Sequence, residues 1–231
     1  MRALILGDIH GEWAYAERLY HELMRERDID LLIQVGDFGY WPRSTQRTWK
    51  RVFDHRALFI CGNHENFEDL VNVRKPDLGL GPSYGAWVEM MRHWEYKHRG
   101  SYEDGILFIG GASSPDKHNR FPGYDWFPQE NISVADEYRI FDTIDRVGAE
   151  NIHTIISHEC PSEFEMQPVL DCHETFDGNR YILEEVRNRV HPERWYFGHY
   201  HERLEGVTDE GTHWRCIGTI ETGDFVIVDL P

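Results

Sequence analysis

The sequence predicts an α/β fold built on a parallel sheet. Three short apolar runs, at residues 3–6, 31–35 and 57–61, are each followed by glycine and have the length and composition of buried strands. Residues 13–27 carry apolar side chains at helical spacing between the first two runs, and residues 44–53 can form a second helix. Strands that alternate with helices in this order usually pair in parallel, so we expect one such sheet in the core.

The middle of the chain is less regular. Residues 75–85 are rich in glycine and proline and predict a loop, whereas residues 105–111 contain a short strand. Residues 113–132 combine proline, glycine and asparagine with several aromatic residues, which favours a long ordered loop. A helix is predicted over residues 133–147, with Ser133 as its N-cap.

The last third of the chain contains a strand–helix–strand pattern and then a group of short strands. Residues 152–157 and 195–197 predict strands, and residues 179–190 predict the helix between them. Three further apolar segments, separated by turns that contain glycine, predict antiparallel strands: 204–207, 213–217 and 225–230.

Length and charge restrict the class of protein. With 231 residues and 40% hydrophobic content, the chain can bury one sizeable core, so we expect a single domain over residues 1–231. No stretch approaches the ~20 apolar residues that span a bilayer, and the run before Gly7 is too short for a signal peptide. We therefore expect a cytoplasmic protein that does not contact membranes. The net charge of −17 opposes binding of long nucleic acids, and the four cysteines, which form no CxxC pair, are expected to be free thiols.

Side chains that bind metals follow each of the first three predicted strands. Asp8 and His10 follow the first strand, Asp37 follows the second, and Asn63 and His64 follow the third. Because ligands bind beyond the carboxyl ends of parallel strands, these side chains should converge. Asp8 and Asp37 could also be helix N-caps, but the nearby histidines favour a metal site.

Two later strands add histidines to this group. His158 follows one strand, and His199 and His201 follow another, where alternation of side chains points both the same way. Carboxylate, amide and imidazole ligands suit first-row divalent ions such as Mn, Fe, Co, Ni or Zn. Seven such groups exceed the needs of one ion, so the sequence predicts two.

The order of these blocks resembles the calcineurin-like metallophosphoesterase superfamily. The blocks are Asp8-x-His10, Gly36-Asp37, Gly62-Asn63-His64-Glu65, His158 and Gly198-His199-x-His201. The resemblance spans nearly the whole chain and implies the four-layer α-β-β-α double β-sandwich of that superfamily.

The resemblance also implies a role for each residue. The ligands of the first ion would be Asp8, His10 and His201, those of the second Asn63, His158 and His199, and Asp37 would bridge both. His64 would be a general acid and not a ligand. The implied reaction is hydrolysis of a phosphodiester or phosphomonoester by a hydroxide that bridges the two ions, with Mn²⁺ the first choice for assays. The substrate would be a small phosphoester, with nucleotides among the candidates.

A second block is similar to one found in uncharacterised bacterial and phage members of the superfamily. It runs from Gly110-Gly111-Ala112-Ser113-Ser114-Pro115-Asp116-Lys117 through Arg120 to Trp126-Phe127-Pro128-Gln129-Glu130. Lys117 and Arg120 are candidates for binding the substrate phosphate, although they equally fit a solvated pair in a loop, and Arg43 is a further candidate. Four aromatic residues could stack on a nucleobase, although packing within loops is their commoner role: Tyr40, Trp41, Trp126 and Phe127.

Three other functions compete with a small-molecule phosphoesterase. Protein phosphatases of the superfamily have a Gly-Asp-x-Val-Asp-Arg-Gly block, and the segment from Gly36 to Arg43 lacks its second aspartate. A nuclease is disfavoured by the acidic charge. A binding module without catalysis would be expected to lack metal ligands or His64, and this chain has them all.

Overall fold

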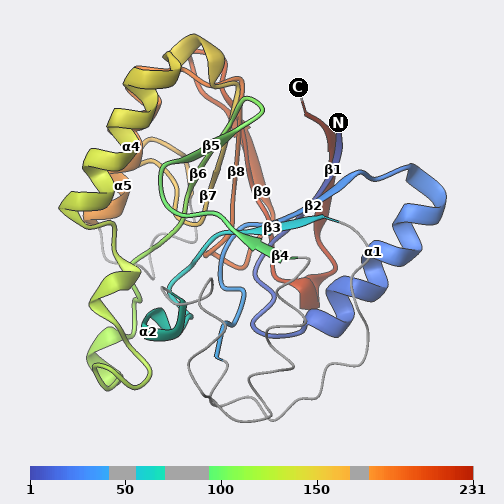
Figure 1. Ribbon diagram of the computed structural model, residues 1–231, viewed down its shortest axis with the longest axis horizontal. Coiled ribbons are helices and arrows are strands. Elements are labelled where there is room, and N and C mark those ends of the chain that lie inside the picture. Colours follow the sequence, from blue (N-terminus) through green and yellow to red (C-terminus); the bar gives the residue numbers. More distant parts are fainter. Residues whose placement is uncertain (42–55, 71–93, 167–176, 231) are drawn as a thin grey trace.

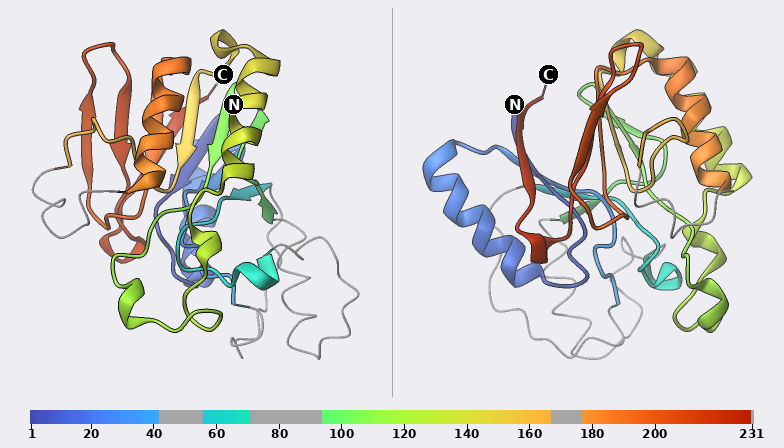
Figure 2. Two further views of the ribbon diagram at one scale, coloured as in Figure 1. Left: turned by 90° about the vertical axis from the view of Figure 1, so that its left-hand side faces the viewer. Right: turned by 180° about the vertical axis from the view of Figure 1, so that it is seen from behind.

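The computed structural model describes residues 1–41, 56–70, 94–166 and 177–230. Two sheets lie face to face between layers of helices (Figure 1, Figure 2). Helix α1 (Trp13–Arg27) covers the outer side of the first sheet, and α4 (Val134–Val147) and α5 (Gly178–Val190) cover the outer side of the second. This arrangement confirms the predicted α/β fold with its four-layer order.

The first sheet has the strand order β11-β1-β2-β3-β4. The predicted parallel pairing is present, because β1 (Arg2–Leu6), β2 (Leu31–Gln34), β3 (Ala57–Phe59) and β4 (Trp94–Tyr96) are all parallel to one another. The last strand, β11 (Phe225–Asp229), pairs antiparallel with β1 and so brings the two ends of the chain together (Figure 1).

The second sheet has the strand order β5-β6-β7-β8-β10-β9. Strands β6, β7 and β8 are parallel to one another. Strand β10 is parallel to β8 but antiparallel to β9. The predicted antiparallel pairing of the C-terminal strands is confirmed for β9 with β10 and for β11, which pairs with β1 of the other sheet, but β10 also pairs in parallel with β8. The strand bounds are Ser101–Glu103 (β5), Ile106–Ile109 (β6), Thr154–Ser157 (β7), Arg194–Phe197 (β8), Leu204–Val207 (β9) and His213–Cys216 (β10).

Alternation of side chains along the strands gives the protein three apolar layers. In β1, Ala3 and Ile5 point between the two sheets, whereas Leu4 and Leu6 pack on the side of α1. Helix α1 contributes Tyr20, which is fully buried. Because each sheet is covered on both faces, its central strands are continuous apolar runs, as the sequence predicted.

Several local predictions can be compared with the structure. Ser133 and Asp136 form a reciprocal capping box at the start of α4, as expected. The loop over residues 113–132 is ordered by two 3₁₀ turns, Lys117–Asn119 and Pro128–Glu130. Strands β4 and β5 were not predicted, because three residues are too few to show a period. The predicted helix at 44–53 and loop at 75–85 lie outside the described residues, as does the rest of the chain after the short helix α2 (Phe67–Leu70) up to residue 93.

Two further predictions concern membrane-spanning segments and the state of the cysteines. Among the described residues, no helix has both the length and the apolar character needed to cross a membrane. The three described cysteines, Cys61, Cys160 and Cys216, are free and buried.

Candidate metal centre

The predicted ligands lie where strands of both sheets end. Asp8, Asp37 and Asn63 follow β1, β2 and β3 of the first sheet, whereas His158 and His199 follow β7 and β8 of the second. The site is therefore formed between the two sheets of the predicted double sandwich. Asp8 is also not a helix N-cap, because α1 begins after Glu12.

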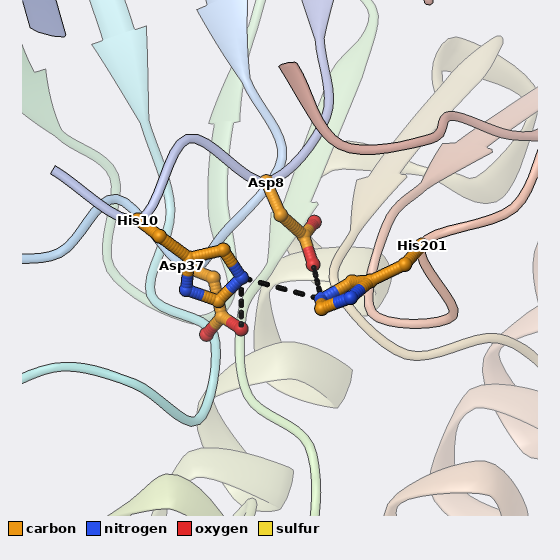
Figure 3. A group of neighbouring side chains, drawn as sticks. All are labelled: Asp8, His10, Asp37 and His201. Atoms are coloured by element: carbon orange, nitrogen blue, oxygen red, sulfur yellow. Dashed lines mark hydrogen bonds and ion pairs between the residues drawn. The ribbon is translucent and has the colours of Figure 1, made fainter. Parts of the chain in front are cut away.

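Four of these side chains form one compact group. One ligand atom each of Asp8, His10, Asp37 and His201 lies within 4.8 Å of the others (Figure 3). The Nε2 atoms of His10 and His201 are 3.2 Å apart, and His201 Nε2 is 3.1 Å from Asp8 Oδ2. A single proton can join only two of these atoms, whereas one divalent cation can bind all four. The donor set therefore fits a first cation.

A second group of acceptors faces the other side of Asp37. His158 Nδ1 is 2.9 Å from the carbonyl oxygen of Val35, which can only accept, so Nδ1 carries the proton and Nε2 faces the site. Asn63 Nδ2 donates to Ser114 Oγ, which turns Asn63 Oδ1 toward His158 Nε2 at 3.2 Å. Two acceptors that face each other need a proton or a cation between them, so this pair fits a second cation.

Asp37 lies between the two groups. Its Oδ2 is 3.8 Å from His10 Nε2, and its Oδ1 is 3.5 Å from His158 Nε2. Oδ1 also accepts the backbone N–H groups of Asn63 and His64, both at 2.8 Å. Burial alone would raise the pKa of Asp37, but the surrounding imidazoles lower it well below its usual range. A carboxylate that stays ionised at this position suits a ligand shared by two cations.

The backbone is strained at the same place. His10, Asp37, His199 and His201 all have positive φ, at 43°, 52°, 69° and 57°. Residues other than glycine rarely adopt this conformation, and it tends to persist where surrounding structure enforces it for function. Here it turns each side chain from the end of its strand into the site.

Three glycines give the site its space. A Cβ atom at Gly36 would lie 2.3 Å from His158 Nδ1, and one at Gly198 would lie 2.2 Å from Asp8 Oδ1. A Cβ atom at Gly62 would lie 2.2 Å from Asp37 Oδ1. The glycines that directly precede ligands in these three sequence motifs are therefore required by close packing against the ligand side chains.

Comparison with known proteins agrees with this geometry. A family model for calcineurin-like phosphoesterases matches residues 1–203, a range that includes both groups of side chains. The chain belongs to the calcineurin-like phosphoesterase family. It is also 26% identical to a UPF0046 protein of Caenorhabditis elegans, over 91% of this chain and 72% of that protein.

One solved crystal structure is similar in fold: it aligns with a TM-score of 0.59 and 10% identity, over 99% of this chain and 94% of the other. A phosphopantetheinyl hydrolase from Mycobacterium tuberculosis aligns with a TM-score of 0.48 and 16% identity, over 95% and 90% of the two chains.

Two buried glutamates, Glu65 and Glu159, contact the loops and side chains that form the site of this calcineurin-like protein. Glu65 is fully buried and accepts backbone N–H groups of Phe38 (2.6 Å), Gly39 (3.3 Å) and Gly62 (2.9 Å), so it ties together the loops after β2 and β3. Burial raises its pKa well above the usual value. Glu159 Oε2 lies 3.6 Å from His199 Nε2. Sequence analysis did not identify Glu159, and its position directly after His158 was the only signal.

His64 and Arg120 lie side by side at the rim of the site. His64 Nε2 is 4.0 Å from Asp37 Oδ2, and Arg120 Nη2 is 3.0 Å from His64 Nε2. Arg120 is also paired with Asp116, at 2.8 Å from Nε to Oδ1. Burial, helped by the Arg120 charge, lowers the pKa of His64 even though Asp37 opposes the shift. The guanidinium and the imidazole thus point to the same region beside the ligand groups.

The remaining predicted substrate residues have different outcomes. Lys117 begins a 3₁₀ turn in the same loop as Arg120, and Arg43 lies outside the described residues. Of the four aromatic residues considered for stacking on a nucleobase, two are half-buried, Trp41 and Trp126. Tyr40 and Phe127 are buried, and the Nε1 atom of Trp41 donates to the carbonyl oxygen of His64.

Proposed function

We propose that this calcineurin-like phosphoesterase hydrolyses small phosphoesters with two divalent cations. The observation that carries the proposal is that two sets of facing acceptors share Asp37 and lie beside His64 and Arg120. The first cation would be held by Asp8, His10, Asp37 and His201, and the second by Asp37, Asn63, His158 and His199. When bound, the cations would polarise the phosphoryl group and lower the pKa of an attacking water molecule.

The residues of the chain supply the other parts of the reaction. Arg120 offers several N–H donors near His64 and would bind a phosphate oxygen. The phosphoester would bring negative charge between Arg120 and His64, which favours the protonated imidazole. His64 would then protonate the leaving oxygen as general acid.

The acid role predicts a dependence on the leaving group. We expect His64→Ala to lower kcat about 10²–10⁴-fold for a substrate with a poor leaving group such as phenyl phosphate. The loss should be smaller for p-nitrophenyl phosphate, whose leaving group needs less protonation. His153→Ala is a suitable control, because His153 is exposed and lies beside Glu193, away from the ligand groups.

Turnover should be measured with added Mn²⁺ on p-nitrophenyl monoester and diester substrates. Equal losses in His64→Ala for good and poor leaving groups would contradict the acid role. No turnover of any phosphoester by protein that carries two Mn²⁺ ions would favour a binding module over an enzyme. A strong preference for the monoester would exclude a dedicated phosphodiesterase.

The loop that carries Arg120 also supports an aromatic leaving group. Phe121 and Tyr124 in this loop are 71% and 77% exposed. They would contact the part of the substrate that leaves on the His64 side, such as a nucleobase or an aryl group.

We expect the double substitution Phe121→Ala and Tyr124→Ala to raise KM for aryl diesters more than for alkyl diesters. Tyr138→Ala is the control, because Tyr138 is equally exposed but lies on α4. Equal effects on both substrates would contradict this specificity.

A further inference from the structure

A buried chain of hydrogen bonds connects the candidate ligand Asn63 to the loop over residues 113–132. Asn63 Nδ2 donates to Ser114 Oγ at 3.1 Å, and Ser114 Oγ donates to Glu130 Oε2 at 2.8 Å. The other oxygen of Glu130 accepts Ser114 N and Trp126 Nε1, both at 2.8 Å. Glu130 is fully buried, and Ser114 and Asn63 are 1% and 4% exposed.

The direction of each hydrogen bond in this chain is fixed by chemistry. Burial raises the pKa of Glu130, but the two N–H groups that donate to it and the nearby charge of Arg120 favour its ionised form. An ionised carboxylate only accepts, so the hydroxyl proton of Ser114 points to Glu130. The oxygen of Ser114 must then accept from its other neighbour, and only the NH₂ group of Asn63 can donate to it. The carbonyl oxygen of Asn63 is consequently turned toward His158 Nε2, 3.2 Å away. A glutamate that never touches the cation site thus decides which atom of Asn63 faces it.

We infer that Glu130, acting through Ser114, is a positioning residue that orients the Asn63 amide for the second cation. The inference rests on the proposed dinuclear site. It also gives a physical role to Ser114, Trp126 and Glu130, three residues of the second sequence block that the reaction itself does not use.

The substitution Glu130→Gln should reverse the chain without changing its shape. Ser114 N and Trp126 Nε1 both donate to the same oxygen, so the amide oxygen of the glutamine has to occupy that position. Its NH₂ group then faces Ser114 Oγ, and the Ser114 hydroxyl has to donate to Asn63 instead. Asn63 turns over to accept this proton and presents its NH₂ group to His158 and the cation. Binding of the second ion should weaken roughly 10–100-fold, which is typical for loss of a residue that orients a metal ligand.

The test is a Mn²⁺ titration of the full-length protein in which the electron paramagnetic resonance signal counts the free ion. Wild type should bind two ions per chain, and Glu130→Gln should keep one site and weaken the other. Trp126→Phe is the matched control, because it removes one donor to Glu130 but leaves the direction of the chain unchanged. Its second site should stay within about three-fold of wild type.

A double variant distinguishes orientation from a general structural role. Asn63→Asp has no NH₂ group, so in combination with Glu130→Gln the reversed chain can end on a carboxylate that still presents oxygen to the cation. Glu130→Gln should therefore weaken the second site in the wild-type background but not in the Asn63→Asp background. Circular dichroism without metal should show that all variants fold.

The outcomes separate the two claims. Equal weakening by Glu130→Gln in both backgrounds, or two wild-type sites in Glu130→Gln, would overturn the inference about Glu130. Binding of fewer than two ions by wild type would instead overturn the dinuclear site on which it rests.

Discussion

The substitution Gly62→Ala should damage the metal centre through a single added carbon. The new Cβ atom would lie 2.2 Å from Asp37 Oδ1, 2.4 Å from Asp37 N and 2.6 Å from His158 Nε2. Contacts of a Cβ atom below 3.0 Å are essentially never found, so Asp37 has to move by about 1 Å in a close-packed region. The φ angle of Gly62 does not lie in the left-handed region, so the effect comes from crowding alone.

The expected losses follow from this displacement. A shift of ~1 Å at a catalytic group can cost ~10²-fold in rate, so kcat/KM with Mn²⁺ should fall by about that factor. The overpacked core should lower the free energy of unfolding by roughly 1–3 kcal/mol. Turnover of p-nitrophenyl substrates, Mn²⁺ content and urea unfolding measure the three quantities.

Gly178→Ala provides the matched control. A Cβ atom at Gly178, the first residue of α5, would have nothing within 4 Å. This variant should keep wild-type activity and metal content. Wild-type activity together with two bound ions in Gly62→Ala would refute the reasoning that Asp37 has no room to move.

Three further predictions address the shared ligand Asp37, the proposed phosphate-binding residue Arg120 and the ion pair of Arg56 with Glu103. Asp37→Asn should reduce metal content at both sites and lower turnover by at least ~10²-fold. The reason is that the two backbone N–H groups that donate to Oδ1 force the new NH₂ group toward His10. Full metal content by elemental analysis would contradict a shared ligand. Arg120→Ala should raise KM about 10-fold or more, whereas Arg189→Ala on α5 should not; unchanged KM in Arg120→Ala would remove Arg120 from phosphate binding. A hydrogen bond from Arg56 is the main cause that lowers the pKa of the Glu103 carboxyl to about 2. Glu103→Gln should therefore lower the free energy of unfolding by roughly 0.5–1 kcal/mol above pH 4.5. Because the folded pKa of Glu103 is depressed, this difference should disappear as the pH falls toward 2, and urea unfolding that gives a constant difference would contradict the assignment.

The candidate metal ligands could be predicted from the sequence because each of them follows a strand. Asp8 and Asp37 come directly after apolar runs that end in glycine, and parallel strands bring their carboxyl ends to one edge. His199 follows the same rule in the second sheet, and His158 also follows a strand directly, although Ser157 and not a glycine precedes it. The pattern of strand, glycine and ligand thus predicts convergence even when the assignment of strands to sheets is incomplete.

The residues that contact the candidate ligands could not be predicted, because these contacts join residues far apart in the chain. Ser114 reaches back to Asn63 across 51 positions, and nothing in the local sequence specifies that pairing. Arg120 meets His64 only because the loop over residues 113–132 folds over the strand ends. Strand β11 was predicted as a strand but not as a neighbour of β1, since a short apolar run does not identify the sheet it will join.

The dinuclear centre itself can be tested most directly by anomalous diffraction from crystals soaked in Mn²⁺. We predict two peaks on opposite sides of Asp37, one among Asp8, His10 and His201 and the other among Asn63, His158 and His199. A single peak at saturating Mn²⁺, or peaks away from Asp37, would contradict the account.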